Sequence, residues 1–89
     1  MSKNLAFSKK AWEEYLYWQS QDKKTLKKIN NLLECLQRGN DELIGKSEKL
    51  TGNLSGFSSV RINSKDRIVY RVKNDIIEIV QCKGHYEDK

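Results

Sequence analysis

The sequence predicts an α+β domain: a short N-terminal strand and a two-helix hairpin, followed by an antiparallel β-meander that packs against the helices. Three features predict this class. Apolar residues recur at helical spacing between residues 9 and 38, and they alternate at strand spacing from residue 57 onward. The intervening residues 40–56 are rich in turn-forming residues. A chain in which helices come first and a run of strands follows is typical of α+β proteins.

Length and composition favour a small folded domain. With 89 residues, 37% hydrophobic and 33% charged, the chain fits one domain over 1–89 with a modest core. No apolar run is long enough for a membrane span and no secretory segment is visible, so we expect a cytoplasmic protein without membrane contact. Two cysteines and one histidine are too few for a four-ligand zinc site. We therefore expect no metal or cofactor, and Cys35 and Cys82 as reduced core thiols.

The net charge bears on the partner. A formal charge of +5 and a pI of about 9.3 favour an anionic partner. Nucleic acid and an acidic protein segment both satisfy this requirement, and the charge does not choose between them.

The N-terminal elements have clear start signals. Residues 3–7 alternate apolar with polar or small side chains and predict a short strand. Ser8 is suited to cap a helix that begins at Lys9, since its hydroxyl can accept from first-turn backbone N–H groups. Ala11, Tyr15 and Trp18 recur at helical spacing, with Trp12 and Leu16 beside them. We expect the aromatic stripe of Trp12, Tyr15 and Trp18 to pack in the core and not to stack on bases.

A second helix follows after a short break. Asp22 can cap its start, and Gly39 and Arg38 suit its C-terminus. The short break predicts an antiparallel helical hairpin. The inward stripe is expected to be Leu26, Ile29, Leu32, Leu33 and Leu36, and the outer face Lys23, Lys24, Lys27, Lys28 and Glu34.

Period-two patterns predict the strands. After a tight turn at 53–56, residues 57–63 form a strand in which Arg61 faces away from its apolar neighbours, Val60 and Ile62. A turn at 63–66 leads to the next strand.

The last two strands form a hairpin. Asn74-Asp75 is its turn, and the nearly continuous apolar run over 76–82 is typical of a central buried strand. In the preceding strand, residues 67–73, one face is expected to carry Ile68, Tyr70 and Val72, and the other Arg67, Val69, Arg71 and Lys73.

The segment from Gly45 to Tyr70 concentrates residues that can act on a phosphodiester. Glu48 is expected on the loop that leads into the sheet, and Arg61 and Arg67 on strands. His85 stands at the end of the last strand. A base, cations and an acid are sufficient to cleave RNA without a metal ion. The alternative is a solvated hairpin whose arginines pair with surface acids, together with an idle histidine.

Three motifs in this order, GKSEKLTGNLSGFSSVRI, DRIVYRV and CKGHY, resemble the YoeB/Txe group of the RelE superfamily, toxins of bacterial toxin–antitoxin systems. WEEYLYW and KKINNLLE match the group's two helices. The resemblance implies a RelE-like fold and an endoribonuclease (mRNA interferase) that cuts messenger RNA in the ribosomal A site and inhibits translation. The partners it implies are a YefM/Axe-like antitoxin, the 70S ribosome with its mRNA, and operator DNA bound only as the toxin–antitoxin complex. A homodimer is left open.

The resemblance also assigns roles to matching positions. Glu48 resembles the general base, His85 the general acid and Arg67 the stabiliser of the transition state. Tyr86 resembles an active-site aromatic residue that contacts the RNA. The RNA-binding set is expected to be Lys46, Lys49, Arg61 and Lys83.

The sequence departs from the family pattern at several positions. Thr51 replaces a lysine, Val60 the first arginine of a common RRI, and Asp66 a common histidine. The chain also continues beyond Tyr86 with residues 87–89. A catalytically inert RNA- or antitoxin-binding module on the same fold is therefore the alternative function.

Overall fold

The structure is a computed structural model, and it describes residues 3–39 and 46–84. Gly45, the first residue of the segment singled out above, and the tail at 87–89 lie outside these residues. The described elements are β1 (Asn4–Phe7), α1 (Lys9–Gln21), α2 (Lys23–Gln37), β2 (Glu48–Lys49), a 3-10 turn at Gly52–Leu54, β3 (Ser58–Arg61), β4 (Arg67–Lys73) and β5 (Ile76–Gln81).

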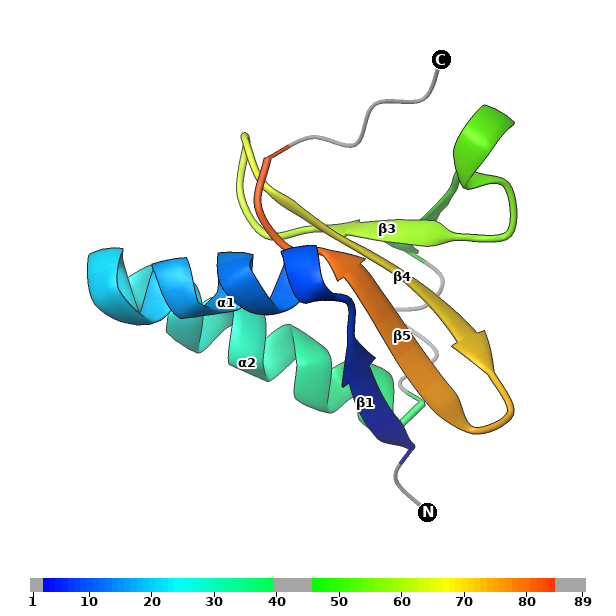
Figure 1. The fold of residues 1–89 in the computed structure, drawn as a ribbon, viewed down its shortest axis with the longest axis horizontal. Coiled ribbons are helices and arrows are strands. Elements are labelled where there is room, and N and C mark those ends of the chain that lie inside the picture. The colour runs from blue at the N-terminus through cyan, green and yellow to red at the C-terminus, as the bar shows by residue number, and fades with distance from the viewer. Residues whose placement is uncertain (1–2, 40–45, 85–89) are drawn as a thin grey trace.

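The strands form one mixed sheet in the order β1-β5-β4-β3-β2. The pairs β2–β3, β3–β4 and β4–β5 are antiparallel, which confirms the predicted meander, and β5 lies between β1 and β4. Strand β1 pairs in parallel with β5, so that Asn4 lies opposite Ile76. The helical hairpin follows β1, at one edge of the sheet, and runs across one face before the chain reaches β2 at the other edge (Figure 1). The predicted α+β class is confirmed.

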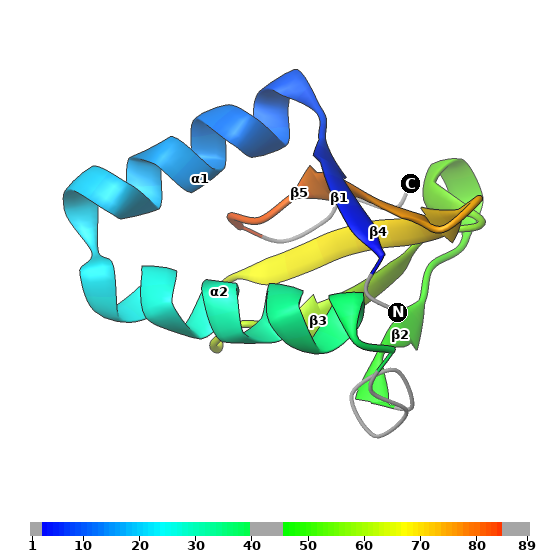
Figure 2. The ribbon, with the colours of Figure 1, turned by 90° about the horizontal axis from the view of Figure 1, so that it is seen from below.

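Small residues mark the ends of both helices. Asp22 ends α1 and caps the start of α2, and so separates the two helices of the hairpin (Figure 2). The Ser8 hydroxyl accepts a hydrogen bond from the Ala11 N–H at 3.1 Å. Asp22 accepts from the Thr25 N–H at 3.0 Å and from its hydroxyl at 2.7 Å, and these hydrogen bonds hold the pKa of Asp22 below its ordinary value. Gly39 follows α2 with φ +69°, a left-handed conformation suited to glycine. All three predicted signals are confirmed.

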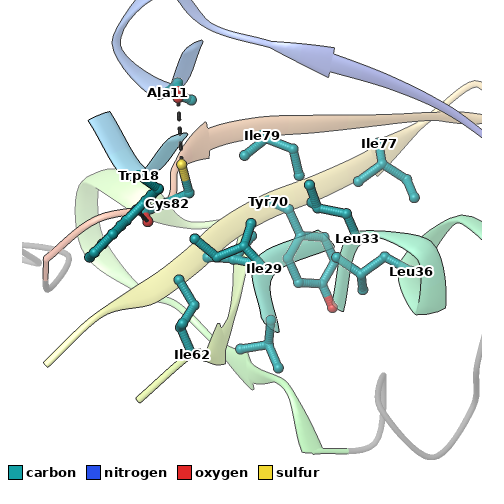
Figure 3. Close-up of a cluster of buried hydrophobic side chains, with 12 residues drawn as sticks. Ala11, Trp18, Ile29, Leu33, Leu36, Ile62, Tyr70, Ile77, Ile79 and Cys82 are labelled. Atoms are coloured by element: carbon teal, nitrogen blue, oxygen red, sulfur yellow. Dashed lines mark hydrogen bonds between the residues drawn. The ribbon is translucent and has the colours of Figure 1, made fainter. Parts of the chain in front are cut away.

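The core lies between the helices and one face of the sheet (Figure 3). The predicted inward face of α2 is confirmed, since Ile29, Leu33 and Leu36 are buried. The sheet contributes a layer of buried residues that meets this face: Val60, Ile62, Ile68, Tyr70, Ile77, Ile79 and Cys82. In the described part of the chain, neither helix is long and apolar enough to cross a bilayer.

The predicted aromatic stripe on α1 is only partly buried. Trp18 is 7% exposed, but Trp12 is 47% exposed, so the expectation that Trp12 belongs to the core is wrong. The buried residues of α1 are Ala11 and Trp18, which lie two turns apart on the same side of the helix. Trp12 follows Ala11 directly, so its side chain points away from that side. The ring of Trp12 instead stacks on Tyr15 and meets the edge of Phe7.

The pairing of β4 keeps the two predicted faces, since Val72 lies opposite the core residue Ile77 and Arg71 lies opposite Glu78, but burial does not follow the faces strictly. Ile68 and Tyr70 are buried as expected, but Val72 is 51% exposed and Val69 is 1% exposed. The pairing of β4 with β5 shifts register between Val69 and Tyr70. The hairpin of β4 and β5 also reaches beyond the ends of both helices (Figures 1 and 2).

Cys82 provides a test of the packing where α1 meets β5. Its side chain is fully buried, and burial, with the charges of Glu14 and Asp66, raises the pKa of the thiol to about 12. Because the thiolate is the reactive form, we expect iodoacetamide at about pH 8 to leave Cys82 unmodified in the native protein and to modify it in denaturant. Mass spectrometry of a Cys35→Ser variant isolates this thiol. Modification of the native protein at the rate of an exposed thiol would contradict the packing.

Candidate active site on the open face of the sheet

The candidate residues lie on the face of the sheet that the helices do not cover. Val60 and Ile68 are partners in the β3–β4 pair and point into the helical core. Arg61 and Arg67, the next pair along, therefore point to the opposite face, because successive side chains on a strand alternate. Glu48 pairs with Ser59, two positions before Arg61, and shares that face.

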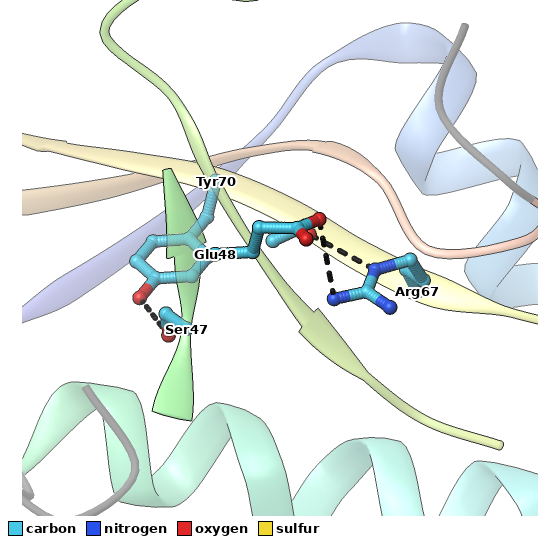
Figure 4. A network of polar contacts seen from close by, with 5 residues as sticks. Ser47, Glu48, Arg67 and Tyr70 are labelled. Atoms are coloured by element: carbon cyan, nitrogen blue, oxygen red, sulfur yellow. Dashed lines mark hydrogen bonds and ion pairs between the residues drawn. The ribbon is translucent and has the colours of Figure 1, made fainter. Parts of the chain in front are cut away.

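Glu48 lies on a strand, and not on a loop as the sequence analysis expected. Strand β2 is two residues long and pairs with Ser58 and Ser59 at the edge of the sheet. Contacts on both sides hold it there. The hydroxyls of Ser47 and Tyr70 are 2.7 Å apart, and the Leu50 N–H donates to the Phe57 carbonyl at 3.0 Å. The backbone of Glu48 is therefore fixed by the contacts of its neighbours, while its side chain is 56% exposed (Figure 4).

Arg67 is held more closely than Glu48. Its Nε donates to the hydroxyl of the fully buried Ser59 at 2.9 Å, and its side chain is 15% exposed. One terminal nitrogen lies 3.9 Å from a carboxylate oxygen of Glu48 (Figure 4). An ion pair of this length with a half-exposed partner contributes roughly 0–1 kcal/mol to stability. Its importance is geometric, because it sets a carboxylate beside an oriented guanidinium.

A groove of about 350 Å³ opens beside this pair, where β2 begins at Glu48 and β3 continues past it as the edge strand. Cations outnumber acids among its lining residues, as a phosphate site requires. The carboxylate adds a proton acceptor. The lining residues are Leu32, Lys46, Glu48, Val60, Arg61 and Arg67.

Two of the other predicted site residues, Lys49 and Lys83, lie away from this groove. Lys49 follows Glu48 on β2, so it points to the other side of the strand, and it lines a separate hollow. The ammonium of Lys83 lies 4.3 Å from the ring centre of Tyr17 on α1. His85 and Tyr86 lie outside the described residues.

Gly84 is a contact residue that the sequence analysis did not single out. Its N–H donates to the Asp66 carboxylate at 2.7 Å. Its carbonyl accepts from the Arg67 N–H at 3.1 Å and from the Gln81 side-chain amide at 3.0 Å. Ser59 was also missed, although its alternation with Arg61 along the strand was a usable signal. No sequence signal connects Asp66 to Gly84.

Side chains of α1 also hold the chain after β5, at Cys82, two residues before Gly84. The Trp18 indole N–H donates to the Cys82 carbonyl at 2.8 Å, and the Cys82 N–H donates to the Glu14 carboxylate at 2.8 Å. The chain that leaves β5 is therefore fixed by side chains from α1 before it reaches Arg67.

The chain is similar to known proteins over most of its length. Residues 7–86 match the family described as the YoeB-like toxin of bacterial type II toxin–antitoxin systems. The toxin YoeB of Escherichia coli (strain K12) is 46% identical over 82 residues, which cover 92% of this chain and 98% of that protein.

Solved structures agree in fold. YoeB in a heterotetrameric YoeB–YefM toxin–antitoxin complex from Staphylococcus aureus matches with a TM-score of 0.82 at 49% identity. A YoeB dimer from the same organism matches with a TM-score of 0.83 at 48% identity. Each alignment covers 97% of this chain and 100% of the other.

Removing the Tyr70 hydroxyl tests whether the core holds the edge strand. Tyr70→Phe should lower the free energy of unfolding by about 1 kcal/mol, because Ser47 loses a hydrogen bond that is partly shielded from water. The Leu50 amide should also exchange faster. Tyr15→Phe is the matched control: its exposed hydrogen bond to Asn30 should be worth less than about 0.5 kcal/mol. Urea unfolding and hydrogen exchange measure both effects, and equal losses in the two variants would contradict the role given to Tyr70.

Proposed function

The chain belongs to the YoeB-like toxins of bacterial type II toxin–antitoxin systems, and from this premise we propose that it is a ribosome-dependent endoribonuclease. It would cut messenger RNA in the ribosomal A site and so inhibit translation. The observation that carries the proposal is the Glu48 carboxylate 3.9 Å from the Arg67 guanidinium, beside a groove that two more cations line.

The proposed reaction is transfer of the phosphodiester to the neighbouring ribose hydroxyl. Glu48 takes the proton from the 2′-hydroxyl, and the 2′-oxygen attacks the adjacent phosphorus. Arg67 stabilises the charge that develops on the phosphorane oxygens. His85 then donates a proton to the departing 5′-oxygen, and Tyr86 contacts the RNA. The products are a 2′,3′-cyclic phosphate and a 5′-hydroxyl, and no step calls for a metal ion.

Burial distinguishes the two arginines of the groove. Arg67 is largely shielded from water and is oriented by Ser59, so its charge can act on the transition state without first being rearranged. Arg61 is exposed at the end of β3, where a cation attracts the RNA backbone by counterion release. We therefore assign Arg67 to the chemical step and Arg61 to substrate positioning.

The lysines receive separate assignments. Lys46 lines the groove and is proposed to bind the reacting segment of RNA. Lys49 and Lys83 lie away from the groove, so we propose that they contact more distant phosphates of the message or of the ribosome.

Arginine substitutions test these roles. Arg67→Ala should lower the single-turnover cleavage rate on programmed ribosomes roughly 100-fold or more. Arg61→Ala should mainly raise the ribosome concentration needed for half-maximal rate, and it should weaken the salt dependence. Arg71→Ala is the matched control, because Arg71 lies on the same face of β4 but pairs with Glu78 and lies over Phe57.

Two results would contradict the assignment. Arg67→Ala would be a binding variant if it raised the half-maximal concentration and spared the rate. The proposed chemistry would be wrong if the cleaved message carried a 3′-hydroxyl and a 5′-phosphate.

The partner proposal has support from the relatives. The Staphylococcus aureus toxin forms a YoeB–YefM complex, and YoeB from that organism also forms a dimer. We propose that this chain binds a YefM/Axe-like antitoxin, that the complex binds operator DNA, and that the chain can form a homodimer. The formal charge of +5 suits an antitoxin segment rich in acids that folds on binding.

Neutralisation by the antitoxin should be visible in the same cleavage assay. We expect the purified complex to lose cleavage of ribosome-bound message, because an acidic segment would compete with RNA for the groove. Full activity of the complex would contradict neutralisation at this site.

Expression without the antitoxin should stop growth with cleaved transcripts, whereas unaffected growth would favour an inert module. The Arg67→Ala variant is the control for toxicity unrelated to cleavage.

A further inference from the structure

We propose that Asp66 is a positioning residue for the reaction: its carboxylate holds Gly84, the residue from which His85 continues the chain, against the backbone of Arg67. The inference rests on the proposed nuclease function. In this role Asp66 does not need to contact either the RNA or the general acid.

The hydrogen bonds around Gly84 are the first support. One donor and two acceptor contacts, to Asp66, Arg67 and Gln81, use both polar backbone groups of Gly84. The bond to Asp66 is the shortest, at 2.7 Å, and it has a carboxylate as acceptor. Hydrogen bonds to ionised acceptors are shorter and stronger than those between neutral groups.

Asp66 is itself held in place, which is necessary for a residue that positions another. Its N–H donates to the Asn63 side-chain oxygen at 2.8 Å. Its carbonyl accepts from the Ile62 N–H at 2.9 Å. Ile62 is fully buried, so the turn that presents the carboxylate is tied to the core.

Gly84 needs such support because regular pairing has already ended. Strand β5 stops at Gln81, and Gly84 has φ +78°, in the left-handed region. Side chains from α1 hold Cys82 on one side. Beyond Cys82, the Asp66 carboxylate accepts the hydrogen bond from the Gly84 N–H.

The connection to chemistry comes from the neighbour of Asp66. Arg67 is the next residue along the chain, and its backbone N–H donates to Gly84 while its side chain lies beside Glu48. A single dipeptide therefore joins the proposed transition-state cation to the residue that precedes the proposed general acid. Loss of the Asp66 contact should loosen this relation without removing any reacting group.

Two substitutions separate the hydrogen bond from the rest of the side chain. Asp66→Ala removes the acceptor and should lower the single-turnover cleavage rate roughly 10- to 100-fold, with ribosome affinity unchanged. Asp66→Asn keeps an acceptor oxygen and should recover the rate to within about threefold of the parent. Ser64→Ala, an exposed position in the same turn, should match the parent protein.

Amide hydrogen exchange gives a readout independent of activity. The Gly84 amide should exchange at least about tenfold faster in Asp66→Ala, and near the parent rate in Asp66→Asn. Thermal unfolding of each variant shows whether the fold is retained. If the alanine variant does not fold, Asp66→Asn keeps the proposal falsifiable, because a loss of cleavage and faster exchange at Gly84 in a folded Asp66→Asn protein would overturn it.

The outcomes distinguish this proposal from the function on which it rests. Parent-like cleavage in Asp66→Ala, unchanged exchange at Gly84, or equal loss in both Asp66 variants would each overturn it. If the parent protein itself does not cleave message on ribosomes, the proposed function fails. Exchange at Gly84 then decides alone: faster exchange in Asp66→Ala supports the hold on Gly84, and unchanged exchange overturns it.

Discussion

Hydrogen bonds to the backbone of Cys82 and Gly84 join the helical layer, the segment after β5 and the start of β4. Trp18 and Glu14 reach Cys82 from the helical layer, and Asp66 and Arg67 reach Gly84 from the start of β4. The helices cover one face of the sheet and the candidate site lies on the other, so the segment after β5 is where the two are connected. The position of the site depends on this connection, because strand pairing no longer constrains the chain there.

The distribution of charge on the open face follows from how its arginines are paired. Arg71 pairs with Glu78 and lies 4.9 Å above the ring of Phe57, so its charge is balanced locally. Among the described residues that line the groove, three are cations, Lys46, Arg61 and Arg67, and one is an acid, Glu48. The groove at the edge of the sheet is therefore lined mainly by cations.

The core and the site share Tyr70. Its ring is buried among residues of the helical layer, and its hydroxyl meets Ser47, directly before Glu48 (Figures 3 and 4). Ser59 has a similar double role, since it is fully buried and also orients Arg67. Substitutions at these two positions should thus affect stability and activity together, unlike substitutions of Arg61.

Several local elements could be predicted from the amino-acid sequence alone: the caps at Ser8 and Asp22, the end of α2 at Gly39, the buried face of α2 and the final hairpin. These depend on residues a few positions apart, so periodicity and turn chemistry reveal them. The motif resemblance named Glu48 and Arg67 as site residues. Tertiary structure decided the parallel pairing of β1 with β5, the strand under Glu48 and the hold on Gly84. Those contacts join distant residues, such as Trp18 and Cys82, 64 positions apart, and no local preference specifies them.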